Sequence, residues 1–248
     1  MSTIALPSII QGGMGIAVSD WRLAHAVSSL GQLGVVSGTA IDSVFVRRLQ
    51  DGDPGGHVRR AMAAFPMPGV AEQVLKRWFR PEGRAPDEKY RELSMYKQVV
   101  SRLRQQTTML AMFVEVWLAK EGHGNPVGVN LLTKIQLPNL ALLYGAMLAG
   151  VDYVLMGAGI PKEVPGALDA MAEHRAASMK LHMPGRMLPI DDADIIAGAP
   201  STRPAVQPST RAGASAMCSD RYVAESTTRS CWACSDSPSF LIAPAKNG

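Results

Sequence analysis

Aromatic residues, cysteines and an excess of charge of one sign are all scarce in this sequence of 248 residues. Phe, Trp and Tyr make up 6% of the chain, which argues against a β-sandwich with an aromatic core. The three cysteines all follow residue 217 and cannot build a disulfide framework. A net charge of +4, spread along the chain, excludes an obvious nucleic-acid partner. Because the cysteines form no disulfide framework, we expect a reducing, cytoplasmic location.

Leader-like and membrane-spanning segments are also lacking. Met1 to Leu6 has neither a basic start nor a long apolar run, so we expect no signal peptide. The most apolar stretch, Leu140–Ile160, contains Asp152 and four glycines. This composition predicts a helix followed by a buried strand, and hence no membrane partner.

The composition changes near residue 198. Residues 1–197 hold most of the apolar side chains, whereas residues 198–248 are rich in Ser, Thr, Ala and Pro. The second segment cannot bury enough apolar surface to offset its ordering entropy, so a disordered tail is predicted there. The biased amino-acid composition of this segment leads to the hypothesis of out-of-frame translation or a truncated gene.

Short apolar runs alternate with helical patterns through residues 1–197. A helix is predicted to begin at Ser19-Asp20, with one apolar run before it and another after it. This order indicates a strand–helix–strand unit. A helical insertion is predicted over about 41–121. The expected strands are Ser8–Gln11, Leu33–Ser37, Pro126–Leu132 and Val151–Met156; the expected helices include Ile41–Gln50, His57–Phe65, Val70–Phe79, Val100–Lys120, Pro138–Ala149 and Val164–His174.

This alternation indicates an α/β fold with a parallel sheet and outer helices, either a TIM (β/α)8 barrel or an open doubly wound sheet. Four strands use the first 156 residues and leave 92. Four more βα units need about 120 residues at roughly 30 each. Only two weak apolar runs remain, Ala193–Ala197 and Phe240–Ala243, so we expect a barrel truncated to about its first four βα units.

Several glycines and one side-chain amide lie just beyond the ends of expected strands, where parallel sheets bind their ligands. Gly12-Gly13-Met14-Gly15 follows the first expected strand, although a tight turn also explains it. Asn130 ends the third, where it suits the edge of a heterocycle or caps a loop. Lys134 is either a cation near a phosphate or reduced flavin, or a solvated lysine.

Histidine and cysteine give no separate catalytic or metal site. The five histidines are His25, His57, His123, His174 and His182, and none has a partner at metal-ligand spacing. No Ser–His–Asp or Cys–His set can be argued. Cys231 and Cys234 have CxxC spacing, but only Cys218 accompanies them, which argues against zinc or redox chemistry.

Four segments together resemble the flavin-dependent nitronate monooxygenases, formerly called 2-nitropropane dioxygenases. The resemblance covers roughly residues 4–175. Flavin-dependent enoyl reductases share the barrel and the Gln-Gly-Gly-Met opening. The segments are Pro7–Gly15, Gly31–Thr39, Val127–Asn130 and Val154–Pro161.

The resemblance implies a TIM barrel that holds FMN and oxidises alkyl nitronates with O2 to a carbonyl compound and nitrite. The family's phosphate-binding glycine loops and its catalytic histidine, both on the later half of the barrel, are not found here. The cofactor-binding residues implied are Gln11, Gly12, Gly13, Met14 and Asn130, and those implied near the ring or substrate are Gly157 and Gly159.

Three functions remain open from the sequence. The first is a nitronate monooxygenase-type enzyme with a small-molecule substrate. The second is a related enoyl reductase of fatty-acid or polyketide synthesis. The third is an inactive fragment, or a module that pairs its half barrel with another chain. A half barrel exposes strand edges, so self-association through those edges is expected.

Overall fold

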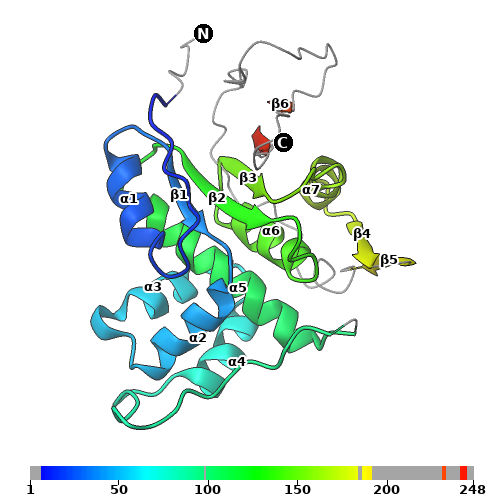
Figure 1. Cartoon of the computed structure of the whole chain (residues 1–248). Coiled ribbons are helices and arrows are strands. Elements are labelled where there is room, and N and C mark those ends of the chain that lie inside the picture. Colours follow the sequence, from blue (N-terminus) through cyan, green and yellow to red (C-terminus); the bar gives the residue numbers. More distant parts are fainter. Residues whose placement is uncertain (1–6, 98, 184–185, 192–230, 233–240, 245–248) are drawn as a thin grey trace.

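The computed structural model describes residues 7–97, 99–183, 186–191, 231–232 and 241–244. Its centre is a parallel sheet of three strands, β1 (Gly34–Ser37), β2 (Val127–Leu132) and β3 (Tyr153–Gly157), in that spatial order (Figure 1). Ser37 pairs with Asn130, and Asn130 with Leu155. The carboxyl ends of all three strands therefore meet at one edge of the sheet. The α/β prediction is confirmed at this level.

The prediction of a full strand over Ser8–Gln11 is wrong, because the strand pairing there is limited to one residue. Only Ile10 forms a bridge, parallel to Leu33. The Gln11 amide donates to the Leu33 carbonyl at 3.0 Å, and the Leu33 amide donates to the Ile9 carbonyl at 3.1 Å. Gly13 then takes a φ of +65°, which ends the extended conformation after this single bridge.

The helices follow the predicted pattern within a few residues. The first, α1 (Trp21–Ser29), begins where predicted because the Asp20 carboxylate accepts from two amides of its first turn. The region of the predicted helical insertion, residues 41–121, is largely helical. It contains α2 (Ile41–Gln50), the 3₁₀ turn η1 (Pro54–Gly56), α3 (His57–Ala63), α4 (Pro68–Trp78) and α5 (Arg102–Lys120), and it is followed later by α6 (Asn139–Leu148) and α7 (Val164–Ala172).

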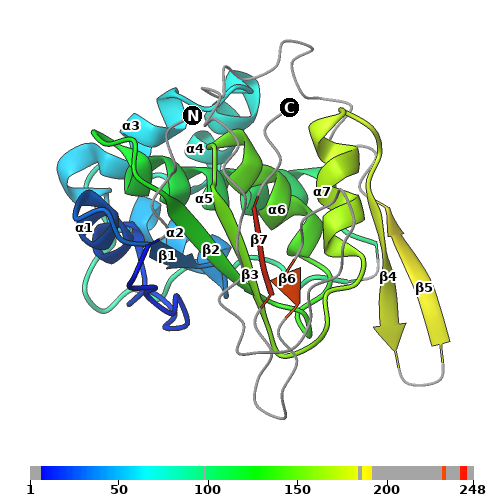
Figure 2. The same ribbon diagram turned by 90° about the horizontal axis from the view of Figure 1, so that it is seen from above.

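The main core lies on one face of the parallel sheet. Buried side chains from helices α1 to α7 share one cluster with alternate strand residues such as Val36, Val129 and Met156. Figure 2 shows α5 and α6 behind the sheet on that side. Val35 and Leu155, which alternate with these core residues along the strands, belong to a second, smaller cluster. Because strand side chains alternate between faces, Asn130 lies on the face opposite Val129, away from these helices.

The C-terminal part adds antiparallel strands that the sequence pattern did not predict. β4 (Ser178–Met183) and β5 (Arg186–Asp191) form a hairpin. β7 (Leu241–Pro244) pairs with β3 and with β6 (Cys231–Trp232), so the larger sheet has the order β1-β2-β3-β7-β6. The described strands form no closed barrel. The run Ala193–Ala197 and most of the predicted disordered tail lie outside the described residues.

Within the described ranges, no helix combines the length and the apolar character that a bilayer crossing requires.

Candidate functional site

Asn130 joins β2 to the glycine loop at residues 12–15. Its Nδ2 donates to the Gly12 carbonyl at 2.7 Å and lies 3.2 Å from Sδ of Met14. The side chain is only 2% exposed. The structure thus brings together residues more than one hundred positions apart that the sequence assigned to one site.

Gln11 fixes the start of this loop. Its Oε1 accepts a hydrogen bond from the Val35 amide at 2.9 Å, so the side chain completes the edge of β1. Its Nε2 is shielded from solvent and has no partner among the described residues. A buried amide donor without an acceptor is unfavourable, and a bound water or ligand is the usual solution.

The two adjacent glycines serve different purposes. A Cβ on Gly13 would lie 2.4 Å from Cγ1 of Val35, so the loop can lie this close to β1 only with glycine there. A Cβ on Gly12 would meet only Cγ of Met14, at 3.9 Å. Gly13 therefore packs the loop onto the sheet, while Gly12 leaves its backbone open to a flat group.

The loop also offers hydrogen-bond donors. In the described part of the chain, the backbone amides of Gly12, Gly13 and Met14 donate to no acceptor. They belong to three consecutive residues that directly follow Gln11, whose Nε2 also has no partner among the described residues. The carbonyl and ring-nitrogen acceptors of a flavin's pyrimidine edge need such donors, so these residues fit that group.

The turn after β3 is attached to the turn after β2. The Gly157 carbonyl accepts from the Thr133 amide at 2.9 Å and from its hydroxyl at 2.6 Å. A Cβ on Gly159 would lie 2.7 Å from Oγ1 of Thr133, and one on Gly157 would lie 3.9 Å from Oδ1 of Asn130. Gly157 therefore adjoins Asn130, and Gly159 keeps the turn close to Thr133.

Sequence reasoning did not identify Thr133. Its position three residues after Asn130, at the end of a strand, was the only available signal. Its role is visible only when the turns after β2 and β3 are placed side by side.

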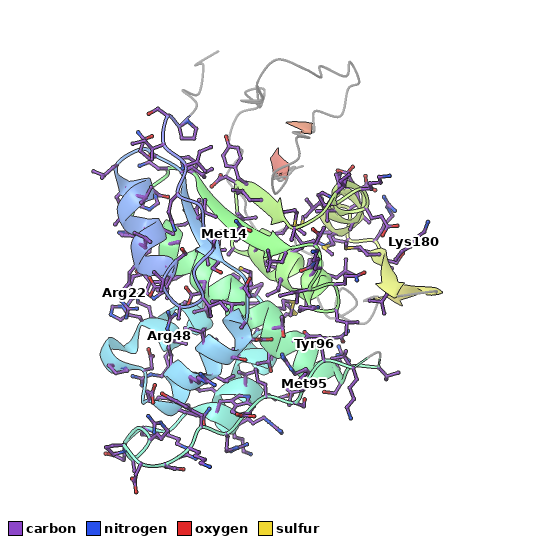
Figure 3. The ribbon with its side chains drawn as sticks, viewed as in Figure 1. Met14, Arg22, Arg48, Met95, Tyr96 and Lys180 are labelled. Atoms are coloured by element: carbon purple, nitrogen blue, oxygen red, sulfur yellow. The ribbon has the colours of Figure 1, made fainter. Side chains whose placement is uncertain are left out.

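Exposed apolar side chains accompany the polar groups. Met14 is 54% exposed, Ile135 after β2 is 43% exposed, and Ile160 after β3 is 53% exposed. Figure 3 shows Met14 in front of the sheet, between β1 and β2. Lys134 is exposed in the same turn as Ile135. Apolar surface beside a few fixed polar groups is typical of sites for small aromatic ligands.

One buried and two half-buried charged side chains hold the segment that leads from the loop into α1. Asp20 and Glu115 both pair with Arg48, and Glu115 also accepts from the Trp21 amide at 2.9 Å. Figure 3 shows Arg48 on α2 below α1. Burial raises the pKa of the Glu115 carboxyl, although Arg48 opposes this effect. The Ser37 amide donates to the Ser19 carbonyl at 2.9 Å, which attaches the same segment to β1.

The histidines do not enter this site. Among the described residues, no three His, Cys, Asp or Glu side chains are grouped so as to hold a metal ion. His25 is a residue of α1, and its ring lies against that of His123. His174 is exposed and follows α7. The side chain of His182 and the residues Cys218 and Cys234 lie outside the described part.

Comparisons with family models, with curated proteins and with solved structures gave no match to this chain.

Proposed function

We propose that the chain is the N-terminal part of an FMN-dependent oxidoreductase of the nitronate monooxygenase type, with a TIM-barrel architecture truncated after its early βα units. The hydrogen bond from Asn130 to Gly12 is the observation that carries the proposal. It joins two of the four segments of the resemblance, next to backbone amides that have no acceptor among the described residues.

The arrangement of layers supports a barrel over a doubly wound sheet. A doubly wound sheet carries helices on both faces, whereas a barrel carries them only outside. Here helices α1 to α7 share one core on one side of β1, β2 and β3. Asn130 and Val35 belong to the opposite face, which corresponds to a barrel interior.

The chain's own groups have defined tasks in this proposal. The backbone amides of Gly12, Gly13 and Met14 would hold the polar edge of the ring system by donating hydrogen bonds to it. Asn130 holds the loop in position, while Met14 and Ile160 cover apolar ring surface and exclude water. When bound, FMN supplies the redox chemistry by which O2 converts a nitronate to a carbonyl compound and nitrite.

The test is nitrite release from propane-2-nitronate in air by the full chain supplied with FMN. We expect turnover with wild-type protein and at least a tenfold loss with Gly12→Val, because branched carbons above Gly12 block the ring's approach. The control is Gly69→Ala, at a helical glycine with open space around its Cβ position. NAD(P)H oxidation with an enoyl thioester but no nitrite release would favour the reductase instead.

Absence of both activities, with FMN bound, would reject catalysis by this chain and leave a binding or assembly module.

A further inference from the structure

Two methionine side chains are exposed in the part of the chain that the structure describes. Met14 in the glycine loop is 54% exposed, and Met95 in the loop between α4 and α5 is 84% exposed. By contrast, Met109, Met112 and Met156 are completely buried. Figure 3 shows Met14 and Met95 at separate places on the molecule. Peroxides can reach both exposed thioethers and oxidise them to sulfoxides.

Met14 differs from Met95 in the contact that its sulfur makes. Nδ2 of Asn130 donates to the Gly12 carbonyl at 2.7 Å and to Sδ of Met14 at 3.2 Å. An amide nitrogen carries two protons, so Asn130 can serve both acceptors at once. Because Asn130 is 2% exposed, neither proton can turn to bulk water instead. The sulfur of Met14 is therefore one of two fixed partners of a buried donor.

Oxidation of the sulfur is incompatible with this contact. A thioether sulfur is a weak acceptor, whereas the sulfur of a sulfoxide carries a partial positive charge and its oxygen a partial negative one. An oxygen added on the side of Asn130 would fall inside the 3.2 Å contact with Nδ2, so the sulfur would have to withdraw. An oxygen added on another side would leave a positive sulfur facing a donor. In both cases the contact between Met14 and Asn130 is lost.

We propose that Met14 is a peroxide-sensitive modification site, at which oxidation of Sδ to a sulfoxide releases the side chain from Asn130. One oxygen atom moves from hydrogen peroxide to Sδ in this step. The O–O bond breaks, an S–O bond forms, the thioether gives up two electrons, and the peroxide leaves as water. Enzymatic reduction of methionine sulfoxide restores the thioether, so the modification is reversible.

The other contacts of the loop do not involve the sulfur. Asn130 still donates to the Gly12 carbonyl, Gln11 still accepts from the Val35 amide, and Gly13 still packs against Val35. We therefore expect oxidation of Met14 to change the surroundings of the Asn130 amide while the chain stays folded.

The first test follows the oxidation of each methionine in the full chain without ligand, in dilute hydrogen peroxide at neutral pH, by mass spectrometry of its peptides. We expect Met14 to be oxidised at least tenfold faster than Met109 and Met112, and Met95 to be oxidised at least as fast as Met14. Oxidation of Met14 at the rate of the buried pair would overturn the proposal.

The second test records the side-chain amide signals of Asn130 by ¹⁵N NMR during the same treatment. Both proton signals should shift at the rate at which Met14 is oxidised, and methionine sulfoxide reductases should return them to their starting positions. The matched control is Met14→Leu, which keeps the exposed Met95 and an apolar side chain in the loop. Its Asn130 signals should not move in peroxide.

Unshifted Asn130 signals in a chain with oxidised Met14 would overturn the proposal. So would an equal shift in Met14→Leu, or signals that stay shifted after Met14 has been reduced.

A weaker affinity of the oxidised chain for FMN also follows, because a polar sulfoxide would replace apolar cover of the ring, but that consequence rests on the proposed function. Both tests are made without flavin. Reversible oxidation that moves the Asn130 signals in a chain that binds no FMN would leave this inference standing and reject the function.

Discussion

Gly13→Ala is the substitution for which the structure gives the clearest cost. The new Cβ would lie 2.4 Å from Cγ1 and 2.9 Å from Cβ of Val35, and 3.1 Å from Cβ of Asn130. Val35 is fully buried on β1 and β-branched, so it cannot turn away. The φ of +65° is a second penalty for a residue with a side chain.

The magnitude can be assembled from these two effects. The left-handed conformation costs about 1–2 kcal/mol and overpacking costs about 1–3 kcal/mol. Alanine returns about 0.4–1 kcal/mol by restricting the unfolded chain. We expect Gly13→Ala to lower the free energy of unfolding by about 1–4.6 kcal/mol, measured by urea denaturation.

Gly12→Ala is the matched control. Its Cβ meets only Cγ of Met14, at 3.9 Å, and Gly12 has no positive φ. We expect its free energy of unfolding to be unchanged or raised by up to about 1 kcal/mol. Equal stability of the two variants would refute the close packing of the loop on β1.

Substitutions at Glu115, Thr133 and Asn130 test the surrounding contacts, again by urea denaturation and with control variants for the first two. Glu115→Ala should lower the free energy of unfolding by about 1–3 kcal/mol because the Trp21 amide and Arg48 lose an acceptor, while the exposed Glu173→Ala should change it by less than about 0.5 kcal/mol. Thr133→Val should cost about 1 kcal/mol through the lost hydrogen bond to Gly157, and Thr133→Ser should restore it. Asn130→Leu should cost about 1–3 kcal/mol, since the Gly12 carbonyl loses its donor. A neutral Thr133→Val or Asn130→Leu, or equal effects of the two glutamate changes, would contradict these assignments.

Local signals predicted most of the helices. The bounds of Ile41–Gln50 were predicted without error, and Asp20 marked the start of α1 because a capping carboxylate acts within its own turn. These features depend on neighbours in sequence, and the pattern of apolar side chains contains them.

Features that depend on distant partners were less predictable. Ser8–Gln11 has the composition of a strand, but its pairing ends after Ile10 because Gly13 turns the chain onto Val35. The hairpin Ser178–Met183 with Arg186–Asp191 lacks a long apolar alternation. Thr133 becomes visible as a site residue only through its contact with Gly157.

The site residues Gln11 to Met14 and Asn130 were suggested by the resemblance, and the structure brings them together. Why they should meet could be inferred from parallel strands, whose carboxyl ends share an edge. Their hydrogen bonds could not be inferred from sequence spacing. That spacing does not show that Asn130 donates to Gly12, or that Nε2 of Gln11 has no partner among the described residues.

The most direct test of the account is an FMN titration of the purified full chain, followed by flavin absorbance and fluorescence, with Gly12→Val beside the wild type. The account predicts saturable binding with perturbed absorbance bands in the wild type and at least tenfold weaker binding in the variant. A folded wild-type chain that leaves the FMN spectrum unchanged, or equal binding by both proteins, would contradict a flavin site at the glycine loop.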